Sequence, residues 1–181
     1  MSDGRSQRRA KVIPFIDRLE RDRNANLQAL VSKAQLLKLD GFESVKWHES
    51  NWKITSGRLV KLTGKNIKAA SFVFTLSPKL GAESLVDSWG EVCKALFVLR
   101  FHRKHQSTPN QRNFITAVGY VAAAATQLGQ KLLNLTPEAL DNACALISKH
   151  YREATAYNLH KHIAEFAAHC DANGLCRVLL Q

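Results

Sequence analysis

The sequence lacks an apolar run long enough to cross a bilayer, and it has no secretion signal. Its longest nearly unbroken apolar run, residues 114–125, is interrupted by Thr116 and Gly119. A membrane-spanning helix needs about 20 apolar residues, so this run is too short. The N-terminal segment MSDGRSQRRAK is polar and basic, and no apolar stretch follows it. We therefore expect a soluble, cytoplasmic protein without a membrane partner.

Motifs for metal, cofactor or nucleophile chemistry are also missing. The sequence contains no H-E-x-x-H pair, no zinc-type cysteine and histidine spacing, no P-loop, no G-x-G-x-x-G and no G-x-S-x-G. His162 and His169 fall on one expected helix, but about 10 Å apart along its axis, so we expect polar surface histidines. We predict no metal, no cofactor and no catalytic residue in this chain.

The sequence has few cysteines, and their spacing does not suggest pairs. The four cysteines have no C-x-x-C spacing and lie within apolar patterns: Cys93, Cys144, Cys170 and Cys176. Such cysteines are typical of buried thiols in a reducing cytoplasm, where they fill space and do not act as nucleophiles.

Acidic residues are few relative to basic ones. The 181 residues include 26 Lys and Arg against 15 Asp and Glu, a net charge of +11, with 45% hydrophobic residues. That composition is globular and excludes a mostly disordered chain. The charge surplus favours an acidic partner, most commonly nucleic acid. Residues 1–82 carry 16 basic and 7 acidic residues, whereas residues 83–181 carry 10 and 8, so a polyanion would depend strongly on the first half.

The first half combines a helix with β-prone pieces. Apolar residues recur at three- and four-residue steps over residues 12–38, which predicts a helix, although the polar stretch 21–26 leaves open two shorter helices. Short β-prone pieces separated by turns predict an antiparallel sheet of two to four strands: residues 45–48, 52–55, 59–62 and 70–76. The turn-like segment Ser77–Gly81 predicts a domain boundary, giving a small α+β region at 1–80 and a helical domain at 81–181.

Four helices are expected in the second half, so the chain is predicted to be mainly α. The first runs over about 83–105, and Ser107-Thr108-Pro109 and Thr136-Pro137-Glu138 each combine a capping residue with an early helical proline. The fourth begins near Glu153 and ends at Asn173-Gly174, a typical left-handed stop. Short connections between these helices are typical of a compact bundle.

Basic and amide side chains at two places in this half point to nucleic acid. One cluster lies at the end of the first helix, and the other follows the polar side of the last helix at spacings of three and four. The candidate DNA-binding residues at these two places are Arg100, Arg103, Lys104, Arg152, Thr155, Asn158, Lys161 and His162. Cations, hydroxyls and amides together suit phosphate positioning and base-edge readout. The same pattern also fits a plain solvated helix face.

A third basic set lies in the first half, interleaved with Trp47 and Trp52: Lys46, Lys53, Arg58, Lys61, Lys65 and Lys68. It fits either a strand surface that follows a nucleic-acid backbone or a sheet edge protected by lysine.

From Trp89 onward, two strings resemble the core-binding domain of tyrosine recombinases, the phage-integrase family: WGEVCKALFVLRFHRKHQSTPNQRNFITAVGYVAAA and LNLTPEALDNACALISKHYREATAYNLHKHIAEFAAHCDANGL. They cover about half of the chain. The similarity lies in a first helix with an Arg-rich end, in the phrase Leu135-Thr136-Pro137-Glu138-Ala139-Leu140, in Ala154-Thr155-Ala156 and in Asn173-Gly174-Leu175. The overall sequence pattern is similar to that of large bacterial integrases with an extra N-terminal region.

The resemblance implies a SAM-like four-helix module that packs on one side of duplex DNA. In this family a separate C-terminal catalytic domain closes the other side and completes a C-shaped clamp. The last helix would then approach a groove, while Arg100, Arg103, Lys104 and Arg112 would hold phosphates. The implied setting is the bacterial cytoplasm and nucleoid, and the resemblance allows self-association on DNA.

The family's catalytic residues are not found in this sequence. None of the seven histidines is followed at the third position by arginine, and Tyr120, Tyr151 and Tyr157 have no such motif around them. We therefore expect the chain not to cleave DNA, and to be the N-terminal part of a recombinase, cut from it or encoded separately. The apolar ending at Gln181 predicts that a longer protein continues past this residue, and the resemblance implies that the continuation is a catalytic domain. A helical protein-interaction or oligomerisation module without direct DNA binding is the alternative, since the second half is nearly neutral and Ala122–Ala125 permits close helix approach.

Overall fold

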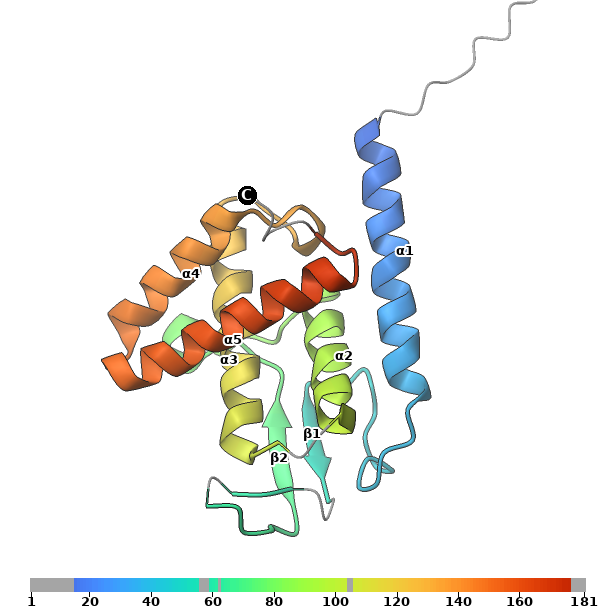
Figure 1. Cartoon of the computed structure of the whole chain (residues 1–181), viewed down its shortest axis with the longest axis vertical. Helices are drawn as coiled ribbons and strands as arrows, with labels where there is room; N and C mark the ends of the chain where they lie inside the picture. Colours follow the sequence, from blue (N-terminus) through green and yellow to red (C-terminus); the bar gives the residue numbers. More distant parts are fainter. Residues whose placement is uncertain (1–14, 56–58, 62, 104–105, 177–181) are drawn as a thin grey trace, which may run out of the picture.

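The structure is a computed structural model that describes residues 15–55, 59–61, 63–103 and 106–176. In chain order the elements are α1 (Phe15–Leu36), β1 (Asn51–Ile54), β2 (Ala70–Val73), the 3-10 turn η1 (Pro78–Leu80), α2 (Asp87–Arg103), α3 (Thr108–Gln127), the 3-10 turn η2 (Leu132–Asn134), α4 (Pro137–His150) and α5 (Glu153–Ala172). The described part is therefore mainly helical with one small antiparallel sheet, as predicted (Figure 1).

The sheet consists of two antiparallel strands with Trp52 opposite Phe72. Trp52 and Phe72 are buried whereas Lys53 and Ser71 are exposed, because successive side chains of a strand point to opposite faces. Of the four β-prone pieces, two form these strands. Residues 45–48 form turns and loop instead, and in the piece at 59–62 the described residues 59–61 contribute only isolated bridges through Val60.

The core is organised around α2, which is buried on almost every side. The ring of Phe97 lies 4.8 Å from Phe72 and 5.5 Å from Phe74, measured between centroids. On the same helix, the Lys94 Nζ donates a 2.7 Å hydrogen bond to the carbonyl of Trp47. The Trp47 Nε1 in turn donates to Glu91 at 2.8 Å, so the turn at 45–48 is held against α2.

The predicted start of the first bundle helix, near residue 83, is four residues too early. The Leu76 amide donates to the Glu83 carbonyl at 2.7 Å and the Leu85 amide to the Phe74 carbonyl at 3.0 Å. Residues 83–85 are thus extended beside residues 74–76, and the helix begins only at Asp87. The pairing is long-range, so helix periodicity could not reveal it.

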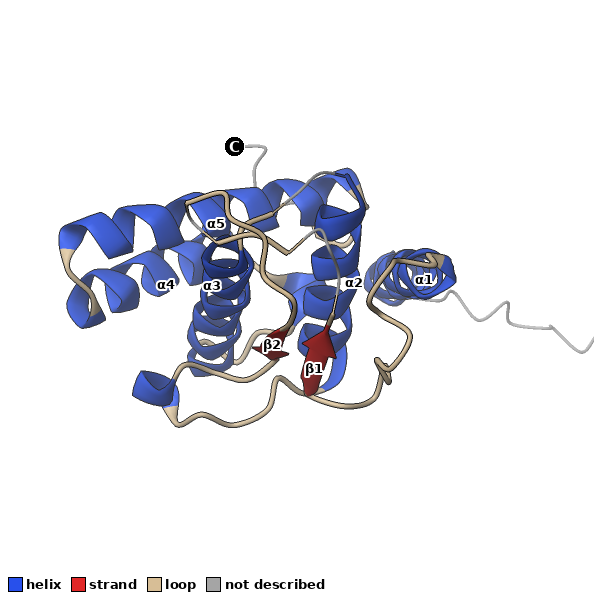
Figure 2. Ribbon diagram, turned by 90° about the horizontal axis from the view of Figure 1, so that it is seen from below, coloured by secondary structure: helices blue, strands red, loops and turns tan. Residues whose placement is uncertain are grey.

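α3, α4 and α5 begin at the predicted positions and α5 also ends at its predicted stop, although the Thr136 side chain makes no capping hydrogen bond to α4. The Ser107 hydroxyl accepts a 3.2 Å hydrogen bond from the Asn110 amide and caps α3. Proline occupies an early position in both α3 and α4. α5 is followed by Gly174 at a φ of 65°, a conformation that favours glycine. α5 crosses α3 on the face turned toward the viewer in Figure 1, and Figure 2 shows the crossing from below.

α1 is one continuous helix despite its polar middle. Leu27, Leu30 and Ala34 are buried, and two polar side chains of the middle stretch make long-range contacts. The Arg23 guanidinium donates to the Leu133 carbonyl at 2.6 Å, and the Asn26 amide donates to the Gly174 carbonyl at 3.0 Å. A boundary near residue 80 stays a prediction, and one cluster of buried residues draws members from both sides of it.

The cysteines match their predicted setting. Cys93, Cys170 and Cys176 are buried, Cys144 is half-buried, and all four are free thiols. Burial raises the pKa of the Cys93 thiol far above its ordinary value, so this side chain is an inert part of the core.

Candidate nucleic-acid interface

A polar hollow of about 530 Å³ lies between the start of α3, the end of α2 and the middle of α5. Its lining is dominated by amides and charged groups: Arg100, Gln106, Ser107, Pro109, Asn110, Asn113, Asn158, Lys161, His162 and Glu165. Four of these were predicted from the sequence as candidate DNA-binding residues. Arg100 from the first cluster therefore meets three residues of the second cluster, Asn158, Lys161 and His162, which are far from it in the chain.

Glu165 organises the inner wall of the hollow. The Arg100 guanidinium pairs with the Glu165 carboxylate, and the His162 Nδ1 lies 3.1 Å from the other carboxylate oxygen. The His169 Nε2 lies 3.8 Å away on the next turn of α5. Burial alone would raise the pKa of Glu165, but His162, His169 and Arg100 outweigh that effect and hold this pKa far below its ordinary value. Glu165 is therefore an anion at neutral pH.

Arg100 is a buried residue, only 4% exposed. Its Nε donates to the Gln111 Oε1 at 3.0 Å, and its guanidinium lies 4.2 Å from the centroid of the Phe114 ring. Burial lowers the pKa of Arg100, and the charge of Glu165 raises it again. The guanidinium is thus held inside the protein by a carboxylate, an amide and a ring, so its geometry serves to join α2 to α5.

His162 is buried as well, which corrects the expectation of surface histidines for this residue. It is 7% exposed, and its ring meets the Phe114 ring at 82° with centroids 6.1 Å apart. Its position on α5 faces inward because the helix packs its 159, 163 and 166 positions into the core, and residue 162 lies on the border of that face.

The outer rim of the hollow carries free polar groups. Asn113, Asn158 and Lys161 make no hydrogen bond or ion pair within the described ranges, and Asn158 and Lys161 are exposed. The Lys161 Nζ lies 4.4 Å from the centroid of the exposed Tyr157 ring. Asn113 was not predicted: it lies opposite the apolar stripe of α3, and only the packing of α3 against α5 brings it to this place.

The backbone amides at the start of α3 are already satisfied. The Thr108 amide donates to the Val60 carbonyl at 2.9 Å, the Asn110 amide to the Ser107 hydroxyl and the Gln111 amide to the Ser107 carbonyl. Residue 109 is proline and has no N–H. The helix start therefore offers no free donor to a phosphate, and any anion would depend on side chains.

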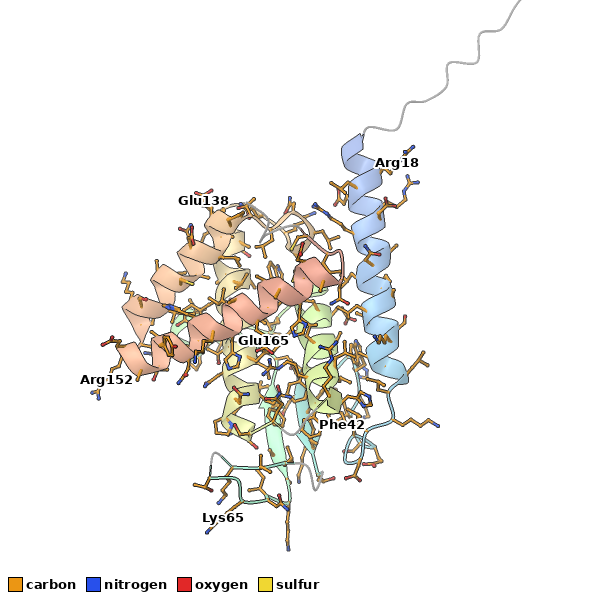
Figure 3. All side chains as sticks on the ribbon, in the orientation of Figure 1. Arg18, Phe42, Lys65, Glu138, Arg152 and Glu165 are labelled. Carbon is orange, nitrogen blue, oxygen red and sulfur yellow. The ribbon has the colours of Figure 1, made fainter. Side chains whose placement is uncertain are left out.

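The remaining predicted residues lie around the hollow or away from it. Arg103, Arg152 and Thr155 are exposed but do not line it. Arg152 lies at the N-terminal end of α5, beside the turn from α4, in Figure 3, whereas Glu165 lies near the middle of the helix. Arg112 faces β2 instead, since its Nη2 donates to the Ser71 carbonyl at 3.2 Å. Lys104 lies outside the described residues.

The described residues contain no group of three or more His, Cys, Asp and Glu side chains arranged to hold a metal ion. No helix among them combines the length and apolar character that crossing a membrane requires.

Comparison of the chain with family models, curated proteins and solved structures finds no match. The functional interpretation therefore rests on the residues and their geometry.

Proposed function

We propose that this chain binds duplex DNA as the non-catalytic N-terminal part of a tyrosine-type site-specific recombinase. In this proposal α2, α3, α4 and α5 are the SAM-like core-binding module, and the catalytic residues belong to a domain that follows Gln181. The observation that carries it is the polar hollow, where unpartnered amides of α3 and α5 stand beside Lys161 on an exposed rim.

The exposed cations around the hollow would contact phosphates. Arg103 ends α2, Arg152 precedes α5 and Lys161 lies about two turns into α5, so the three exposed side chains are distributed over the surface of these two helices. Phosphate contacts supply most of the affinity and fix the register of a protein on DNA. Arg100 would take no phosphate here, because its guanidinium is occupied by Glu165.

The amides would read base edges. Side-chain amides make paired hydrogen bonds to adenine in the major groove, where an α-helix also fits. Asn158 lies on α5 and Asn113 lies on α3, on the two helices that border the hollow. Both side chains are free to turn toward a base, whereas Asn110 donates to the Gln106 side chain at 2.5 Å.

The alternative of a protein-interaction module loses one of its supports. Ala122, Ala124 and Ala125 are buried inside the chain, where α3 packs against α4 and α5. Close helix approach at this stretch is therefore used within the fold, and nothing about it favours a second protein.

Replacing Arg152 and Lys161 together by alanine is expected to weaken duplex binding about tenfold while leaving the melting temperature within about 2 °C. The two side chains are exposed, and Arg152 makes no capping hydrogen bond, so little stability depends on them. Fluorescence anisotropy of a labelled duplex would give the affinity and circular dichroism the melting temperature.

The matched control is Arg21→Ala with Lys33→Ala, which removes the same two charges from exposed positions of α1. Equal affinity of both double variants would show that the α5 face is ordinary solvated surface. Absence of duplex binding by the unaltered chain at low salt would refute the proposed function itself.

A further inference from the structure

The segment that contains β1, β2 and the loop between them has an unusual charge pattern. The 33 residues from Ser50 to Ala82 contain six basic residues and no acidic one: Lys53, Arg58, Lys61, Lys65, Lys68 and Lys79. Lys61, Lys65 and Lys68 are exposed, and none of them has an ion-pair partner among the described residues. Their charges are therefore available to an outside partner.

The loop has a defined shape. The Lys61 amide donates to the Lys65 carbonyl at 2.8 Å, the Gly64 amide to the Lys61 carbonyl at 2.9 Å and the Ile67 amide to the Leu59 carbonyl at 3.0 Å. Gly64 has a φ of 79° at the tip, where glycine is favoured. Leu59 is fully buried and fixes the base of this small hairpin in the core. The three lysines are therefore presented from an ordered support.

A backbone bridge fixes the hairpin beside the candidate interface. Val60 pairs with Ser107 in a parallel bridge, and the Thr108 amide donates to the Val60 carbonyl at 2.9 Å. Ser107 lines the polar hollow. The loop lies at the foot of α3 in Figure 1, Lys65 marks it in Figure 3, and in Figure 2 it leaves the strands toward the side on which α5 lies.

The two interpretations that the sequence left open for these lysines can now be separated. Protection of a sheet edge concerns Lys53, which lies on β1, but not the three lysines of the hairpin, which lie outside both strands. Stacking of unpaired bases is disfavoured as well: Trp52 is buried, Trp47 is half-buried and donates to Glu91, and the described hairpin residues include no aromatic side chain.

We propose that the hairpin described by residues 59–61 and 63–68 is a second contact to the phosphate backbone of the same duplex, made by Lys61, Lys65 and Lys68. This inference rests on the proposed function, because it extends the α5 surface across the bridge between Val60 and Ser107. A nucleic-acid backbone is the partner that fits, since three unpaired ammonium groups on an ordered loop suit a regular row of phosphates.

The test replaces Lys61, Lys65 and Lys68 together by glutamine and measures duplex affinity over a salt series. Each lost phosphate contact lowers the slope of log K against log salt by about 0.9, so the slope is expected to become shallower by about 2.7. At 100 mM salt we expect affinity to fall at least tenfold below that of a control with Lys33, Lys38 and Lys131 changed to glutamine. These control lysines are also exposed, and Lys131 lies beyond the far end of α3, about 30 Å of helix from the hairpin.

The outcomes separate the two proposals. If Arg152→Ala with Lys161→Ala weakens binding but the hairpin variant matches its control, the hairpin contact is refuted and the proposed function stands. If the unaltered chain does not bind duplex, both are refuted.

A second measurement avoids substitutions altogether. Bound duplex should protect Lys61, Lys65 and Lys68 of the unaltered chain from an amine-acetylating reagent, read by mass spectrometry, while Lys33, Lys38 and Lys131 react as before. Equal reactivity of the two sets with and without duplex would overturn the inference, even if the glutamine variant failed to fold.

Discussion

Raising the salt concentration from 50 to 200 mM is expected to weaken duplex binding by this chain about a thousandfold. Six exposed cations can contact phosphates: Arg103, Arg152 and Lys161 on α2 and α5, and Lys61, Lys65 and Lys68 on the hairpin. Six contacts give a slope of about −5.4 for log K against log salt, because each contact releases counterions on binding. Anisotropy titrations at four or more salt concentrations would measure this slope.

The slope of log K against log salt also shows how many of these cations contact phosphates. If only the three cations on α2 and α5 contact phosphates, the slope is about −2.7 and the loss over the same range is about fortyfold. A single-stranded oligonucleotide of equal length is the control, since a single strand releases fewer counterions per contact and gives a slope of about −0.7 per phosphate. Duplex affinity that does not change with salt would contradict a phosphate-based interface.

Replacing Glu165 by alanine is expected to lower the free energy of unfolding by about 2 kcal/mol. The substitution leaves the Arg100 guanidinium, 4% exposed, without its carboxylate. Removal of one partner from a fully buried ion pair costs about 3–5 kcal/mol, and we reduce this because the Glu165 side chain is 37% exposed. Thermal unfolding should show a melting temperature lower by about 4–8 °C.

The same substitution should change how stability depends on pH. The pKa of Glu165 lies below its ordinary value of 4.5 in the folded chain, so its carboxylate stabilises the fold above that pH and the contribution is lost as the pH falls below it. The difference in stability between the unaltered chain and the Glu165→Ala variant should therefore be largest near neutral pH and shrink toward pH 3.

Glu20→Ala provides the comparison, because Glu20 is an exposed carboxylate on α1 and has no partner within the described ranges. It should cost less than about 0.5 kcal/mol at any pH. If the Glu165→Ala chain is as stable as the Glu20→Ala chain, the ion pair between Arg100 and Glu165 contributes nothing to the stability of the fold.

Local signals in the sequence predicted most of the helices, because capping is a local interaction. Ser107 caps α3 through an amide three residues away, and the stop at Gly174 depends on the φ of one residue. The late start of α2 and the continuity of α1 depend on partners far along the chain, such as the Phe74 carbonyl for Leu85 and the Leu133 carbonyl for Arg23. No periodicity contains that information.

The sequence predicted which types of residue form the candidate site, but not the role of each residue in it. Arg100 occurs in an apolar stripe four residues after Leu96, which could have marked it as buried, but its partner Glu165 could be found only by packing α2 against α5. The lysines of the hairpin were recognised as basic, yet their place beside α3 depends on the bridge from Val60 to Ser107. Helix-to-helix and loop-to-helix placement is therefore the information that the residue pattern lacks.

The long-range contacts of α1 affect the order in which the chain folds during its synthesis. α1 leaves the ribosome first, but Leu133 and Gly174 lie 110 and 148 residues beyond the α1 side chains that bind them. At about 5–20 residues per second, roughly 7–30 s pass between translation of Asn26 and that of its partner. α1 packs mainly against α2, which is translated soon after it, whereas its contacts with η2 and Gly174 must wait for later parts of the chain. Docking of α1 is therefore expected to proceed in two stages, first onto α2 and finally onto the end of α5.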